Sequence, residues 1–156
     1  MAIARSGKII ALWSVFLFGT VFHTQLALMP LFHGIDVATA HSHATESIAD
    51  ISLILWLMLL FFVLPMGAIA ATAFWESRRY RIVHFQLTIV YTIMNFLHFV
   101  LDFTVIPIQW YQITLMFALF VNGILLNMVA WQWLKESSNA SQTKSDRAKN
   151  STALTR

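Results

Sequence analysis

Imidazole and carboxylate side chains are the groups in this chain that could do chemistry, and they gather in residues 21–50. This segment holds four of the six histidines and three acidic residues, and it contains no lysine or arginine. Imidazole nitrogen and carboxylate oxygen bind Zn, Cu, Ni, Mn and Fe(II), and an acidic surface attracts cations. The candidate ligands in this segment are His23, His33, Asp36, His41, His43, Glu46 and Asp50.

A second set of polar residues, the polar stripe, repeats at helical spacing within residues 82–105. Successive members lie four, three, four, three and four positions apart, so all of them fall on one face of a helix. The last two, His98 and Asp102, are one turn apart and can touch. The carboxylate can then fix the tautomer of an imidazole whose other nitrogen binds a ligand. The stripe consists of His84, Thr88, Tyr91, Asn95, His98 and Asp102.

The elements that must position these residues are membrane-spanning helices. The chain has 156 residues, of which 58% are hydrophobic and 11% charged, whereas soluble domains carry about 25% charged residues. Four apolar stretches are each long enough to cross ~30 Å of hydrocarbon as a helix. We predict an all-α integral membrane protein, a four-helix transmembrane bundle in one domain, residues 1–135. Its spans are about 9–29, 51–74, 82–105 and 108–134, with a loop at 30–50.

Basic residues lie on one side of this topology. They occur at Arg5 and Lys8, within 78–81, and from Lys135 onward. The excess of positive charge predicts that both termini are cytoplasmic and that loop 30–50 is external. The formal net charge of +3 therefore indicates orientation rather than a nucleic-acid partner. The polar segment 136–156 is predicted to be a disordered cytoplasmic tail.

Depth in the membrane connects the two sets of residues. His23 lies six residues before the expected end of the first span, and His98 lies seven before the end of the third. At 1.5 Å per residue, both lie ~10 Å below the external surface, whereas His84 lies ~20 Å away from them. We therefore predict a site centred on His23, His98 and Asp102, without His84. Its expected accessory ligands are His33, His41, His43 and Glu46.

Two occupants fit this site, a transition-metal ion and a haem b held between His23 and His98. The separation of His84 and His98 by 14 positions resembles the spacing with which cytochrome b helices hold two stacked haems, which implies haem ligation by both. The resemblance covers one helix, because no other span supplies a matching pair of histidines. Gly19, one turn before His23, would leave room for a porphyrin edge. The external half, however, has no lysine or arginine to neutralise the propionates.

The same polar residues fit two other functions. In the first, the polar stripe is a relay in proton or quinone chemistry, joined by Asn122 and Asn127. In the second, the protein is a non-catalytic structural or assembly subunit of a larger membrane complex. The polar residues then serve helix packing, through hydrogen bonds worth ~0.6–2 kcal/mol each.

Catalytic signatures do not decide among these functions. The sequence contains no nucleophile triad motif, phosphate-binding glycine loop, zinc-protease motif or dinucleotide fingerprint, so enzyme activity stays open. The lipid bilayer is the expected partner, with other membrane proteins or further copies of the chain, and nucleic acid is not. The preferred prediction is a His/Asp site that binds a transition metal or a metal-containing cofactor, for redox chemistry or metal handling.

Overall fold

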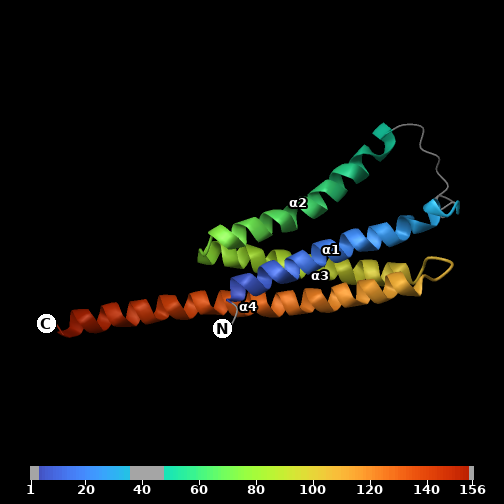
Figure 1. Cartoon of the computed structure of the whole chain (residues 1–156). Coiled ribbons are helices and arrows are strands. Elements are labelled where there is room, and N and C mark those ends of the chain that lie inside the picture. Colours follow the sequence, from blue (N-terminus) through green and yellow to red (C-terminus); the bar gives the residue numbers. More distant parts are fainter. Residues whose placement is uncertain (1–3, 36–47, 155–156) are drawn as a thin grey trace.

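The computed structural model of the chain describes residues 4–35 and 48–154, and every regular element in them is helical (Figure 1). The elements are α1 (Arg5–Phe32), a short 3-10 helix η2 (Ile48–Ile51), α2 (Ser52–Phe74), α3 (Arg78–Asp102) and α4 (Trp110–Leu154). Four of these helices are long and apolar enough to cross a membrane. The prediction of an all-helical chain with four such helices is confirmed.

The ends of α1, α2 and α3 differ from the predicted spans by at most four residues, as in α3, which runs from Arg78 to Asp102 instead of 82–105, and α4 differs by more. Helix α1 continues past Pro30 to Phe32, and at its end the carbonyl of Pro30 accepts hydrogen bonds from the N–H groups of His33 and Ile35. Helix α4 continues to Leu154, through residues where the sequence predicts a disordered tail. Residues 136–154 contain no proline or glycine to end the helix, so the backbone continues in the helical conformation.

The two ends of the bundle carry different residues, and we name them accordingly. The basic end is where α1 and α3 begin. There Arg5 pairs with Glu136, and Arg81 donates a hydrogen bond of 2.7 Å to the carbonyl oxygen of Trp133. The histidine end is the opposite one, where α1 and α3 finish at Phe32 and Asp102.

Helix α4 packs along both α1 and α3, and α2 packs against α1. In Figure 1, α2 lies close to the other helices near its junction with α3 and moves away from them toward Ser52. The buried residues of α2 are Pro65, Ala68 and Thr72, all in its half nearer the basic end. Every residue of the other half, 53–60, is exposed. Helix α2 is therefore anchored at the basic end and unpacked at the histidine end.

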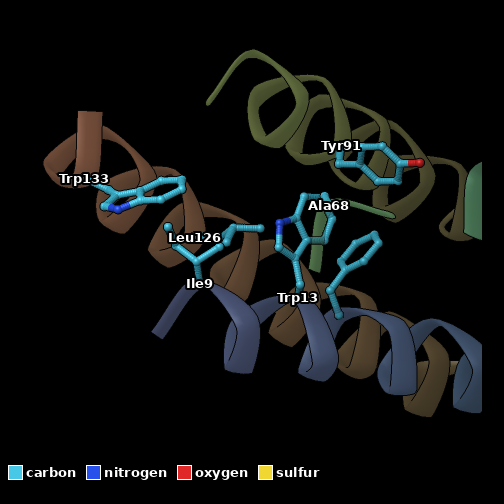
Figure 2. Close-up of a cluster of buried hydrophobic side chains, with 7 residues drawn as sticks. Ile9, Trp13, Ala68, Tyr91, Leu126 and Trp133 are labelled. Atoms are coloured by element: carbon cyan, nitrogen blue, oxygen red, sulfur yellow. The ribbon is translucent and has the colours of Figure 1, made fainter. Parts of the chain in front are cut away.

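The apolar core lies in the half of the bundle nearer the basic end. Figure 2 shows Trp13 of α1 reaching toward Ala68 of α2 and Tyr91 of α3, with Leu126 of α4 beside it and Trp133 of α4 further along, beyond Leu126. The indole of Trp13 meets the ring of Tyr91 edge to face, with centroids 5.3 Å apart. This core joins all four helices and fixes the rotation of α1 and α3 about their axes. That rotation decides which of their polar residues meet further along.

Candidate metal centre

The imidazoles of His23 and His98 meet between α1 and α3, toward the histidine end. Their Nε2 atoms are 3.2 Å apart, although the residues are separated by 75 positions in sequence. The rings are nearly perpendicular, at 82°, with centroids 5.1 Å apart. His23 is buried, with 8% of its surface exposed. His23 and His98 therefore lie at the same level of the bundle, as predicted, and they are in direct contact.

Asp102 completes the group. Its Oδ1 atom lies 3.6 Å from Nε2 of His98, one helical turn away, and its side chain is 13% exposed. One ligand atom from each of His23, His98 and Asp102 can be chosen so that all three lie within 4.8 Å of one another. The structure therefore brings together the three residues at the centre of the predicted site.

Two of the three separations between these atoms suit a tetrahedral metal ion, and the third, between His23 and Asp102, lies within 4.8 Å. Metal bonds of about 2.0–2.1 Å in tetrahedral geometry place neighbouring ligand atoms ~3.3 Å apart. The two Nε2 atoms are separated by 3.2 Å, and Nε2 of His98 and Oδ1 of Asp102 by 3.6 Å. Three protein ligands would leave one position for a further ligand on a tetrahedral ion, as in metal sites that exchange ligands.

Three buried polar atoms on this stretch of α1 and α3 lack a hydrogen-bond partner. They are Nδ1 of His23, Oδ2 of Asp102 and Nδ2 of Asn95, which lies one turn before His98. Buried polar atoms without partners are costly and rare. A metal-bound histidine usually donates from its second nitrogen to a carboxylate, a carbonyl or water. The pattern of unpaired atoms is what a site completed by an ion and its bound water would show.

No protein-family model matches the chain, and neither the curated proteins nor the solved structures searched contain a significant match to it.

The predicted accessory ligands do not join this group within the described residues. His33 caps the end of α1 and is exposed, and ten residues of helix separate it from His23 by ~15 Å. His41, His43 and Glu46 lie outside the described residues, as does Asp36, so their contribution stays a prediction.

The polar stripe faces the bundle interior over most of its length. His84, Thr88, Tyr91 and Asn95 are buried, as their spacing predicts. His98 differs, because 54% of its side chain is exposed. The reason is the path of α2, which covers the stripe near the basic end but diverges from α3 before reaching His98.

His84 is a packed histidine, separate from the His23–His98 contact. Its Nε2 accepts a hydrogen bond of 3.3 Å from the indole N–H of Trp13, and its Nδ1 lies 3.2 Å from the hydroxyl of Tyr80. Since an indole nitrogen can only donate, Nδ1 carries the proton and donates to Tyr80. Both nitrogens are thus engaged within the protein, and the haem ligation implied for His84 by the cytochrome b spacing is not supported.

Gly19 lies where α1 meets α4, and together with Leu119 it lines an apolar surface groove between these two helices. A Cβ atom on Gly19 would overlap the side chain of Leu119, so the glycine serves close packing of α1 against α4. The prediction that Gly19 leaves room for a porphyrin edge stays a prediction. The contact between the two histidines does not match a haem ligand pair, because two axial ligands on one haem iron stand ~4 Å apart, given metal–nitrogen bonds of about 2.0 Å. The observed 3.2 Å between the two Nε2 atoms is shorter.

Proposed function

We propose that the protein is a multi-pass integral membrane protein with both termini in the cytoplasm and a transition-metal centre in its external half. The orientation rests on the basic residues gathered at one end of the bundle. The metal centre rests on one observation, the convergence of two imidazoles and one carboxylate, whose ligand atoms lie within 4.8 Å of one another. Intramembrane ionisable residues that meet in this way are by default candidates for a functional site.

The ligand set favours particular ions. Two nitrogen ligands and one carboxylate oxygen suit Zn²⁺ and the later first-row transition metals, whereas Mg²⁺ and Ca²⁺ prefer oxygen ligands. Two neutral imidazoles and one carboxylate carry one negative charge, so a divalent ion leaves a net charge of about +1 in a low-dielectric region. That excess favours an anionic or strongly polar molecule at the remaining position. The function that follows is metal handling or chemistry at a metal with one exchangeable ligand.

A second candidate function is a structural subunit of a membrane assembly. It is favoured by the polar contacts that fix the helices to one another. The side-chain amide of Asn122 donates to the carbonyl of Leu12 at 3.0 Å, and that of Asn127 donates to the hydroxyl of Thr92 at 3.0 Å. These two asparagines therefore serve packing of α4 and not a relay along the polar stripe.

Metal content of the purified protein tests the first proposal. We expect wild-type protein to retain a transition metal near one equivalent, and His23→Ala and His98→Ala to lose it. His84→Ala is the control, since it removes an imidazole ~20 Å away by helical rise and should leave the metal in place. Gel filtration and circular dichroism establish that each variant is folded. Equal metal content in all three variants would contradict the proposal.

An optical spectrum of the same samples separates the alternatives. A Soret band that disappears in His98→Ala would indicate haem instead of a metal ion. Protein without metal or haem that purifies only together with other membrane proteins would favour the structural subunit.

A further inference from the structure

The metal centre is the second of two similar layers along α1 and α3. In the first layer, Phe16 and Tyr91 pack with ring centroids 5.7 Å apart. Phe61 of α2 lies against both, at 6.1 Å from Phe16 and 5.1 Å from Tyr91. One aromatic residue from each of α1, α2 and α3 thus closes this layer. The groove between α1 and α3 is covered by α2 at this level.

The second layer lies two helical turns further along. His23 and His98 each follow their first-layer counterparts by seven residues, which returns them to the same helix face. Because α2 runs in the opposite direction, its counterpart position is seven residues before Phe61, at Ile54. Ile54 is 57% exposed, within the unpacked segment 53–60. Among the described residues of α2, none takes the place that Phe61 takes in the first layer.

The uncovered side of this layer faces the apolar surroundings of the bundle. Helix α4 packs along α1 and α3, and α2 diverges from the other helices toward Ser52 (Figure 1). Among the described residues, the side of this layer that corresponds to Phe61 is therefore left uncovered, and we call it the opening. His98 lies at the opening, with 54% of its side chain exposed, while His23 behind it is buried. The residues flanking His98 on α3 are apolar and exposed, Leu97 at 55% and Leu101 at 60%. An opening with such walls, within a span, faces hydrocarbon rather than water.

We propose that the metal centre takes its remaining ligand from the bilayer, through the opening between α2 and α3. This inference rests on the proposed metal site. The ligand class is a membrane-dissolved molecule with an apolar body and one oxygen or nitrogen donor at its polar head. The apolar body lies against Leu97, Leu101 and the exposed side of α2, and the donor lone pair replaces a metal-bound water. Ile54 and its neighbours on α2 border the passage.

Cobalt substitution provides the measurement. Co²⁺ is loaded into the protein in lipid nanodiscs, and its visible absorption reports the ligand set. A band that is absent in His98→Ala establishes the metal site itself. The probes are 1-dodecylimidazole, which dissolves in the bilayer, and imidazole, which carries the same donor in water. We expect the lipid-soluble probe to shift the cobalt band at concentrations at least tenfold lower than those imidazole requires.

A cross-link across the opening tests whether the probe enters from the bilayer through this opening, the lateral route, or is only enriched because it dissolves in the bilayer. The chain contains no cysteine, so Ile54→Cys combined with Leu97→Cys can be joined by the shortest bis-maleimide that reacts. The matched control is the same double variant with both thiols capped by N-ethylmaleimide. We expect the cross-linked protein to keep Co²⁺ but to lose its response to 1-dodecylimidazole, and the capped protein to respond.

The outcomes distinguish the two proposals. A cobalt spectrum that does not depend on His98 contradicts the metal centre and, with it, the lateral route. A His98-dependent spectrum that responds equally to both probes, or to neither, overturns the lateral route alone. An unchanged response after cross-linking also overturns it, because α2 would then not border the passage.

Discussion

The hydroxyl of Tyr91 on α3 donates a hydrogen bond of 2.8 Å to the backbone carbonyl of Phe61 on α2. In a regular helix this carbonyl would accept from the N–H four residues later, but that residue is Pro65, which has no N–H. Tyr91 therefore satisfies the carbonyl that Pro65 leaves without a donor, as neighbouring groups do where proline occurs in membrane helices. The bond ties α2 to α3 at the last level where α2 covers the groove.

The Tyr91–Phe61 bond should be energetically coupled to Pro65. We expect Tyr91→Phe to lower the free energy of unfolding by about 0.6–1.7 kcal/mol, the range of hydrogen bonds between membrane helices. In a Pro65→Ala background the alanine N–H can donate to the carbonyl of Phe61. There Tyr91→Phe should lower the free energy of unfolding by less than it does in the wild-type background. Unfolding of the two single variants and the double variant in mixed micelles measures the coupling. Strictly additive effects would show that Tyr91 does not replace the missing N–H.

The contact between His23 and His98 is a feature that sequence could predict, because helical rise and apolar span ends fix the depth of each residue. The burial of His84, Thr88, Tyr91 and Asn95 followed from spacing alone. The exposure of His98 could not be predicted, since it depends on the path of a different helix. Pro65 and the uniform hydrophobicity of 53–60 mark α2 as unusual in sequence. These two features do not show that α2 diverges from the other helices, because an evenly apolar helix has no preferred packing face.

The partners of His84 were also beyond sequence reasoning. Its burial could be expected, but its hydrogen bond to Trp13 joins residues separated by 71 positions. An indole at the end of a span is more commonly an interfacial anchor. Here Trp13 is fully buried, with 0% of its surface exposed, and the only available hint was its position opposite the start of the polar stripe.

Two glycines in the helices should respond in opposite ways to the same substitution. A Cβ on Gly67 meets no atom within 4 Å, whereas one on Gly123 would lie 2.9 Å from Oγ1 of Thr92, the atom that accepts from Asn127. Replacing glycine by alanine inside a helix is worth about 0.5–1 kcal/mol in favour of folding. We expect Gly67→Ala to be stabilising by this amount and Gly123→Ala to be destabilising, by weakening the contact of α3 with α4. The same sign in both unfolding measurements would contradict the packing described for Gly123.

His84 should contribute to stability and not to metal binding. His84→Phe leaves the indole N–H of Trp13 buried without an acceptor, which should cost about 1–3 kcal/mol. Replacing Trp13 by phenylalanine as well removes the unsatisfied donor, so the double variant should be more stable than the sum of the single effects predicts. Thermal unfolding of the three variants measures this, and metal content should stay at the wild-type level throughout. Loss of metal in folded His84→Phe protein would require a connection between the two histidine sites that the structure does not show.

Metal affinity should depend on the charge of the Asp102 side chain and, independently of that charge, on the pH of the solution. Asp102→Asn keeps the shape of the side chain but replaces a charged ligand by a neutral amide. We therefore expect Zn²⁺ affinity to fall by more than the about 10–100-fold lost when a group that only supports a metal–histidine bond is removed. Protons compete with the ion for the imidazoles of His23 and His98, so affinity should decrease as pH is lowered in wild type and in Asp102→Asn alike. Titration with Zn²⁺ against a fluorescent chelator at several pH values measures both effects. His33→Ala, at the exposed end of α1, is the control that should match wild type. An affinity that is independent of pH, or that falls only in His33→Ala, would place the ion elsewhere in the chain.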